Sequence, residues 1–497
     1  MTAQPTVIPR PEHTFTRAHV SENALKVLYR LKNAGYAAYL VGGCVRDQLL
    51  GREPKDFDVA TDAHPEQVRE LFRNCRLIGR RFRLAHVRFR DEIIEVATFR
   101  GAGLAVEDDD GDDDGEVEES AVGRVTDDNV YGTIEEDALR RDFTVNGLYY
   151  NIEDFSVVDY VGGLADIEAG LLRLIGDPWQ RYREDPVRML RAVRFAAKLG
   201  FRIHPESEAP IHELAPLLAD IPPARLFEEV LKLFQGGCAL ETYEQLRHYG
   251  LFEYLFPLTE ESLEHEEEGF PLTFVARALR NTDERVNAGL PVTPAFLFAA
   301  LLWEPLRERA ALLQANGAPR AEAFQRAADE VISEQVRHIA FPRRFSVQAR
   351  EIWSLQPRLE ERHSKRIGAL LEHPRFRAAY DFLVLRSEAG EGGEEAADWW
   401  TRYQESDEAA RDVMAGEAGG RQRNSRKPRK GRKGGRAQGE ESGPPASAQE
   451  QAGEALTGES NGDDDAPNGG GRRRRRRRRG RRGGRRAPAE TSRTDPV

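Results

Sequence analysis

The chain has 497 residues, enough for two or three domains, but its 39% apolar content and mean hydropathy of −0.62 are low for a chain that folds throughout. Its longest apolar run, residues 295–303, is too short to cross a bilayer, and the N-terminal segment has no apolar signal core. Three cysteines without paired spacing argue against a disulfide framework and a zinc knuckle. We therefore expect a cytoplasmic protein without a transmembrane segment, part of which does not fold.

The net charge of −11 conceals an asymmetry. Residues 421–497 contain 22 Lys and Arg but only 10 Asp and Glu, a net charge of +12, so the remainder of the chain carries −23. An acidic folded part joined to a basic tail predicts that the tail binds a polyanion.

At the N-terminus, residues 1–20 predict an irregular arm. Ser21 is a suitable cap for an amphipathic helix over residues 22–34, which Gly35 ends. These residues carry no chemistry of their own.

Two glycines follow a buried strand predicted over residues 37–41 and precede a short helical pattern. Gly42 and Gly43 let backbone N–H groups approach an anion closely, and the helix N-terminus adds partial positive charge. Arg46 falls on the polar face of this helix and can add a charge-assisted fork to a phosphate. The stretch predicts a phosphate cradle, although a Gly-Gly pair alone is more often only a turn.

Two carboxylates follow the cradle. Asp56 and Asp58 lie two residues apart on a predicted strand, so both point to one side while Phe57 turns into the core. Such a pair beside a phosphate cradle suits two magnesium ions that activate a hydroxyl and stabilise a leaving pyrophosphate. Glu95, on a strand predicted over residues 92–100, is a geometric candidate for a third carboxylate, and an exposed strand residue is the alternative.

Helices, strands and charged loops alternate in the next part of the chain. Residues 66–72 predict a helix, and residues 77–87 (LIGRRFRLAHV) predict a strand–turn–strand with three arginines. Ten acidic residues among residues 107–119 repel one another, which predicts a disordered loop and not a metal site. Residues 134–150 (IEEDALRRDFTVNGLYY) begin as a helix and become apolar, with a charged cluster, RRD, at the junction that is also compatible with surface salt bridges.

Residues 184–201 predict one helix, with Pro186 in its first turn and Gly200 as its stop. Arg188 and Arg191 share a face of this helix because they lie three residues apart. With Asp185 they offer donors and acceptors to the edge of a base, and a helix with an exposed basic stripe is the alternative.

The remaining folded part is predicted to be all-α. Beyond about residue 405 the chain turns to Gly, Ser, Ala, Gln and charge, which predicts a disordered tail with two arginine blocks, residues 421–436 and 472–486. We expect the tail to bind phosphates without sequence preference, with acidic partners or an anionic membrane surface as alternatives. The second block begins with Arg472, Arg473, Arg474 and Arg475. The helices are predicted at residues 224–235, 242–249, 296–301, 322–339 and 346–355.

The first motif matches GGxVRDxLLGxxxKDxDxxT at every fixed position and resembles the head of the class II nucleotidyltransferases, in the tRNA nucleotidyltransferase/poly(A) polymerase family. The RRDFTxNxLYY motif (with Gly147 where Ala or Ser is commoner), a flexible linker at residues 159–170 and an EDxxR motif add to the resemblance, which covers roughly residues 20–260 and, more weakly, the chain to about residue 400. Residues 77–87 resemble a GRRFRxAHV-like signature that favours bacterial poly(A) polymerases over their CCA-adding relatives.

The resemblance implies an α+β fold in which a small mixed-sheet nucleotidyltransferase head precedes an all-α neck and body. It assigns residues 21–155 to the head, with an acidic loop at 103–128. The neck would cover residues 156–260 and the body residues 261–405, and both are expected to bind RNA. The basic tail then comprises residues 406–497.

The activity that the resemblance implies is template-independent transfer of AMP from ATP to RNA 3′ ends, of mRNA and structured RNA, in contact with the RNA-decay machinery. Two Mg²⁺ ions would be held by Asp56 and Asp58, with Asp142 or Glu95, and Asp142 binds either metal or the ribose hydroxyl. The alternatives are a CCA-adding tRNA nucleotidyltransferase and a catalytically inactive RNA-binding regulator. The residues implied to bind the nucleotide are Gly42, Gly43, Arg46, Arg140 and Arg141, together with Asp185, Arg188 and Arg191, which would select adenine.

Overall fold

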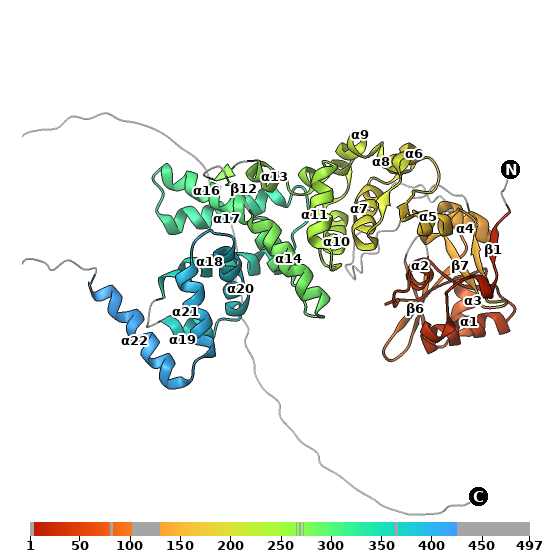
Figure 1. Ribbon diagram of the computed structural model, residues 1–497, viewed down its shortest axis with the longest axis horizontal. Helices are drawn as coiled ribbons and strands as arrows, with labels where there is room; N and C mark the ends of the chain where they lie inside the picture. Colours follow the sequence, from red (N-terminus) through yellow and green to blue (C-terminus); the bar gives the residue numbers. More distant parts are fainter. Residues whose placement is uncertain are drawn as a thin grey trace, which may run out of the picture. The chain divides into compact units, whose positions relative to one another are not determined.

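The computed structural model describes residues 4–79, 83–101, 130–264, 273–362 and 366–424, together with the short strands 266–267 and 270–271 (Figure 1). Within these ranges, no helix combines the length and the apolar character needed to span a bilayer. Several sequence predictions lie outside the described residues: the arginines at positions 80 and 81, the acidic loop, and the arginine blocks beyond residue 424, including Arg472 to Arg475.

An eight-stranded mixed sheet forms the N-terminal part of the fold, as predicted. Its strand order is β1-β8-β7-β2-β3-β6-β5-β4, and β3 and β6 run parallel while the other neighbours are antiparallel. The strands are β1 (Thr6–Ile8), β2 (Ala38–Val41), β3 (Asp58–Thr61), β4 (Cys75–Ile78), β5 (Leu84–Arg88), β6 (Ile93–Thr98), β7 (Leu148–Asn151) and β8 (Val157–Asp159).

Helices cover both faces of this sheet (Figure 1). α1 (Glu22–Asn33) and α3 (Pro65–Leu71) pack on one face, and α4 (Ile134–Arg140) packs on the other. Successive strand residues point to opposite faces, so Leu40 joins the core with α1 and α3, whereas Val41 joins the smaller core with α4. The sheet therefore packs against helices on both faces.

The N-terminal predictions hold except for the arm. The Ser21 hydroxyl accepts a hydrogen bond from the Ala24 N–H and caps α1, which ends before Gly35 as predicted. Residues 6–8, predicted to be irregular, instead form β1 and pair with β8. Backbone hydrogen bonding to a distant strand leaves no trace in the side-chain pattern of so short a segment, and the sheet consequently includes strands on either side of the predicted head limits.

The helix predicted over residues 184–201 corresponds to one helix, which begins three residues later than predicted. α6 (Pro178–Glu184) ends before Asp185, which has an extended backbone, and α7 (Val187–Leu199) begins after Pro186. A proline disfavours helical geometry in the residue before it, which explains the break. Gly200 ends α7 with a φ of 70°, as predicted.

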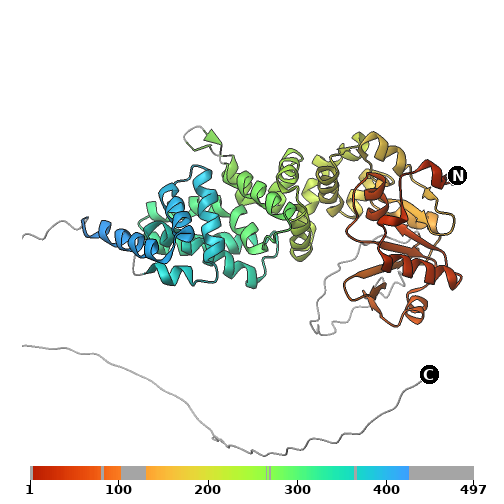
Figure 2. The ribbon, with the colours of Figure 1, turned by 60° about the horizontal axis from the view of Figure 1, so that its bottom comes forward.

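Beyond α7 the described chain is mainly helical, as predicted, and α18 (Arg343–Glu361), α20 (Phe376–Glu388) and α21 (Glu394–Glu405) pack around Trp400 (Figures 1 and 2, teal to blue). The five predicted helices correspond to α10, α11, α15, α17 and α18, and α22 occupies the first part of the segment predicted as a tail. The remaining helices are α2 (Gly43–Leu49), α5 (Gly163–Ala169), α8 (Pro205–Glu208), α9 (Ile211–Leu214), α10 (Pro223–Phe234), α11 (Ala239–His248), α12 (Phe252–Leu255), α13 (Pro257–Leu263), α14 (Phe274–Asn287), α15 (Pro294–Leu301), α16 (Trp303–Ala315), α17 (Arg320–Gln335), α18 (Arg343–Glu361), α19 (Ile367–Leu371), α20 (Phe376–Glu388), α21 (Glu394–Glu405) and α22 (Glu408–Asn424).

Two glutamates are buried together where α16 meets the residues after α20. Glu304 is fully buried, and the side chain of Glu391 is only 6% exposed. The indole N–H of Trp303 donates to Glu391 Oε2 at 2.6 Å, and Arg307 Nε donates to Glu304 Oε2 at 3.0 Å. Burial, followed by the hydrogen bond and charge of Glu391, raises the pKa of Glu304 to about 8. The pair therefore holds a proton at neutral pH.

This pair makes stability depend on pH. Since the folded-state pKa of Glu304 is raised from 4.5 to about 8, its protonation stabilises the fold fully below about pH 4.5, and this contribution is lost as the pH rises through 8. Glu304→Gln keeps a neutral side chain, so we expect its melting temperature, relative to the unmodified protein, to rise between about pH 6 and about pH 9. Calorimetry at both pH values measures this, with exposed Glu308→Gln on the same helix as the control. A pH-independent difference for Glu304→Gln would contradict the assignment.

Candidate active site

A glycine turn, a carboxylate and an arginine meet where β2 ends. Gly42 precedes α2 with a φ of 75°, a conformation that favours glycine. A Cβ atom at Gly42 would lie 3.8 Å from Nη1 of Arg141 and 4.0 Å from Oδ2 of Asp58. The predicted cradle, one predicted carboxylate and one predicted phosphate ligand are thus neighbours.

Parallel pairing of β3 and β6 brings Glu95 to the predicted carboxylate pair. Asp58 is the first residue of β3 and lies in register with Glu95, whereas Asp56 precedes the strand and is exposed. The prediction that both aspartates lie on a strand was therefore wrong for Asp56, although Phe57 between them is buried as predicted. Burial raises the pKa of Asp58 to about 6; Glu95 and Asp56 add to this effect, and Arg141 opposes it.

These carboxylates fit a divalent cation. Among the described residues, no three His, Cys, Asp or Glu side chains already form a metal-binding group. Asp56, Asp58 and Glu95 nevertheless supply the hard oxygen donors that Mg²⁺ prefers. The repulsion that contributes to the raised pKa of Asp58 is also what a cation would relieve. Glu95 meanwhile contacts His86, with 3.4 Å between Oε1 and Nε2.

Asp142 is held by α7. Its side chain is buried, and Oδ2 accepts hydrogen bonds from Nε and Nη2 of Arg191. Oδ1 accepts from the Phe143 N–H at 2.7 Å and from Nδ2 of Asn146 at 3.1 Å. Burial alone would raise the pKa of Asp142, but the charge and hydrogen bonds of Arg191 hold it at about 2. In this structure Asp142 is thus an anion whose hydrogen-bond partners are Arg191, the Asn146 side chain and the Phe143 N–H.

Arg46, predicted to lie on the polar face of α2 and to bind phosphate, is buried in this structure. It is 2% exposed, its Nη1 donates to Oδ1 of Asn146, and its Nε donates to Oδ1 of Asp47 at 2.8 Å. The guanidinium carbon also lies 5.4 Å from the centre of the Phe195 ring. Phe195 belongs to α7 and Asn146 to the short helix over residues 144–146, so residues distant in sequence contact a side chain that the sequence pattern alone marks as polar.

Arg140 and Arg141 share one acidic partner that the sequence reasoning missed. Nη2 of each arginine lies 3.0 and 2.9 Å, respectively, from a carboxylate oxygen of Asp137. Asp137 is only 1% exposed. The available signal was its spacing: the arginines follow it by three and four residues, which places all three on one side of α4.

Each of the three residues predicted to read a base has another side-chain or main-chain partner in this structure. Asp185 accepts a hydrogen bond from Nη2 of Arg225 at 2.8 Å, and Arg225 comes from α10. Arg188 is fully buried, with its Nη1 bonded to a main-chain oxygen of α6 and to Glu184. Arg191 contacts Asp142 instead. The alternative of an exposed basic stripe does not hold for Arg188, because α6 and α10 cover this end of α7. That the three residues read a base stays a prediction.

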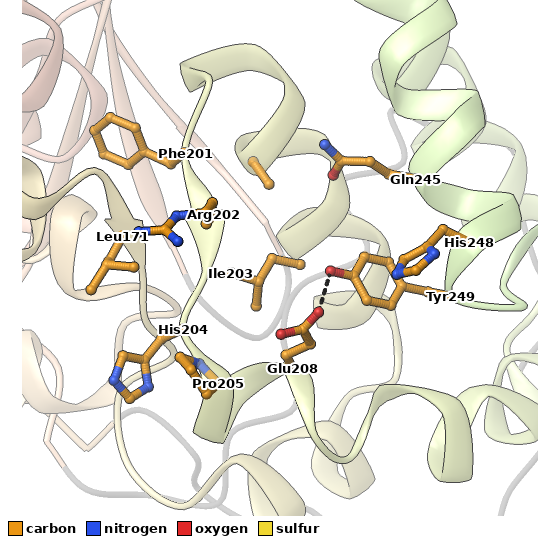
Figure 3. A pocket seen from close by; sticks show the side chains of 11 residues that line it. Leu171, Phe201, Arg202, Ile203, His204, Pro205, Glu208, Gln245, His248 and Tyr249 are labelled. Atoms are coloured by element: carbon orange, nitrogen blue, oxygen red, sulfur yellow. Dashed lines mark hydrogen bonds between the residues drawn. The ribbon is translucent and has the colours of Figure 1, made fainter.

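A separate cavity of about 520 Å³ lies between α11 and the short strands β9 (Leu171–Leu172) and β10 (Arg202–Ile203) (Figure 3). Phe201 and Tyr249 contribute aromatic walls. The Tyr249 hydroxyl donates to Glu208 at 2.8 Å, as the dashed line in Figure 3 shows. The cavity does not include the carboxylates at β3 and β6.

The site is compatible with a nucleotidyltransferase, and the relatives of the chain establish this class. Three family models match the chain, described as the poly A polymerase head domain (residues 38–173), the probable RNA and SrmB-binding site of polymerase A (200–263) and the polymerase A arginine-rich C-terminus (316–434). Poly(A) polymerase I of Salmonella typhi is 54% identical over 404 residues, covering 81% of this chain and 86% of that protein. The chain belongs to the poly(A) polymerase family.

CCA-adding enzymes are more distant. That of Bacillus licheniformis is 37% identical over 232 residues, 47% of this chain and 55% of the enzyme. The fold is nevertheless shared: a solved structure of the Bacillus stearothermophilus CCA-adding enzyme in complex with CTP has a TM-score of 0.51 and 27% identity, covering 76% of this chain and 80% of that one. Sequence identity therefore distinguishes poly(A) polymerases from CCA-adding enzymes as relatives of this chain more clearly than the fold does.

Proposed function

We propose that this chain is a template-independent poly(A) polymerase, which transfers AMP from ATP to the 3′ hydroxyl of RNA and releases pyrophosphate. Similarity to a Poly(A) polymerase I over most of both chains carries this proposal. The intact carboxylates beside the glycine turn support an active enzyme and argue against an inactive RNA-binding regulator.

We assign Asp56, Asp58 and Glu95 to two magnesium ions. Bound there, the ions would lower the pKa of the RNA 3′ hydroxyl and neutralise charge on the triphosphate. The register between Asp58 and Glu95 supports Glu95 as the third carboxylate.

Arg141 and the glycine turn are proposed to hold the triphosphate. Gly42 leaves room for close approach, and Nη1 of Arg141 is directed to the same point as Asp58. Gly43 is proposed to contribute its backbone N–H. Arg46 lies beneath the turn, where a Cβ at Gly43 would be 3.6 Å from its Nη2, so it supports the turn as well as adding positive charge. Arg140 adds positive charge nearby.

Nucleotide binding is proposed to exchange contacts that α7 makes here. Because all four lone pairs of Asp142 already accept hydrogen bonds, either of its proposed roles, binding metal or binding the ribose hydroxyl, requires a contact such as that of Arg191 to open. Arg191, with Asp185 and Arg188, would then present donors and acceptors to adenine. Arg225 holds Asp185 in place before this exchange.

The test is 3′ extension of a single-stranded RNA by the purified protein with Mg²⁺, supplied with either ATP or CTP. A long ladder with ATP and little product with CTP is expected. Three additions restricted to a tRNA lacking its CCA end, using both nucleotides, would instead establish the CCA-adding alternative. No extension with either nucleotide, despite RNA binding, would leave only the regulator.

A further inference from the structure

One buried carboxylate organises the phosphate side of the site. Oδ1 of Asp137 accepts from Nε and Nη2 of Arg140, at 3.2 and 3.0 Å, and from the Arg100 N–H at 3.3 Å. Oδ2 accepts from Nε and Nη2 of Arg141, at 3.2 and 2.9 Å, and from the Tyr149 hydroxyl at 2.7 Å. Burial opposes ionisation, but the charges of Arg141 and Arg140 and the Tyr149 hydrogen bond hold the pKa of Asp137 at about 2. Asp137 is thus a buried anion with six donors around it.

These contacts set the direction of Arg141. The N–H at Nε of Arg141 is shared between two acceptors, Oδ2 of Asp137 and the Tyr149 hydroxyl, which lies 3.0 Å away. A guanidinium is planar and rigid, so fixing Nε and Nη2 also fixes the direction of Nη1. Nη1 is the nitrogen next to Gly42, on the side where Oδ2 of Asp58 lies.

We propose that Asp137 is a positioning residue that aims Arg141 at the triphosphate of the bound nucleotide without touching the substrate itself. This inference rests on the proposed function, because it takes the ligand of Arg141 to be ATP. An asparagine has nearly the same shape but is neutral, and its NH₂ group would oppose arginine donors, so it cannot satisfy the same six contacts. The carboxylate is therefore needed, and filling the space is not enough.

Asp137→Asn in the full chain tests this proposal by two measurements. Calorimetric titration with ATP is expected to show about 10- to 100-fold weaker binding, the size of one charged hydrogen-bonding contact, while adenosine binding stays within about twofold. In extension assays the KM for ATP is expected to rise by a similar factor, with the KM for RNA unchanged.

Asp166→Asn is the matched control. Asp166 is also a buried carboxylate, and it accepts hydrogen bonds from Arg173 and the Thr144 hydroxyl. Asp166→Asn removes a buried negative charge just as Asp137→Asn does. Equal losses of ATP affinity in both variants would therefore show that Asp137 acts only through stability. ATP affinity that stays unchanged in Asp137→Asn would also overturn the proposal.

A double-mutant cycle separates positioning from independent effects. If Asp137 acts through Arg141, Asp137→Asn lowers ATP affinity no further in an Arg141→Ala background, whereas additive losses contradict the proposal. Because ATP binding is measured without turnover, the failures are distinguishable. A protein that binds ATP but extends no RNA would refute the proposed function while leaving this test of Asp137 intact.

Discussion

Asp58→Asn is expected to abolish AMP transfer, lowering kcat by a factor of at least ~10³, while RNA affinity stays within about threefold. Asp58 is the carboxylate at the meeting point of the glycine turn, Arg141 and Glu95. Loss of its charge weakens the proposed metal site, and several kcal/mol of transition-state stabilisation correspond to a factor of this size. Single-turnover extension with ATP and a separate RNA-binding titration measure the two quantities.

The control for this variant is Asp91→Asn, the same substitution at a residue whose side chain is 83% exposed. It is expected to leave both quantities unaltered. Substantial turnover by Asp58→Asn at saturating Mg²⁺ would show that the metal site is misassigned. Loss of RNA affinity equal to the loss of rate would point to a folding defect, which a melting curve identifies.

Removal of residues 425–497 is expected to weaken binding of single-stranded RNA about 100-fold or more at low salt and to flatten its salt dependence. This segment has 20 Lys and Arg against 10 Asp and Glu, and the described part of α22 remains in the truncated chain. Each phosphate neutralised on a single strand contributes about 0.7 to the slope of log affinity against log salt. Titrations at several salt concentrations measure that slope, and kcat with saturating RNA is expected to be retained.

A full-length control replaces the eight arginines at 472–479 by glutamine, which keeps chain length and removes charge. It is expected to lose a large part of the same slope. An unchanged slope in the truncated chain would exclude the tail from RNA binding. The same pair of proteins, tested on vesicles containing anionic lipid, decides whether the tail instead binds a membrane surface.

The sequence by itself determined the local features of this protein. The buried strand before the two glycines and the short helix after them were predicted because strand and helix periods can be read from apolar spacing. Ser21 capped its helix, Gly200 ended α7, and Phe57 turned into the core, since each depends on residues only a few positions away. The resemblance of its motifs to those of poly(A) polymerases then predicted the family, which the comparisons with known proteins confirmed.

Only the tertiary structure decided which charged groups far apart in sequence meet. The alignment of Glu95 with Asp58 follows from parallel pairing of β3 with β6, which no local pattern encodes. The contacts of Arg191 with Asp142 and of Arg225 with Asp185 join residues 49 and 40 positions apart. Burying a charge without a partner lowers the stability of the fold by several kcal/mol. Each of these arginines therefore pairs with an acid that the fold brings near it. Side-chain period predicts which face is polar, but long-range packing decides whether that face meets water or other side chains, as the burial of Arg46 against Asn146 and Phe195 demonstrates.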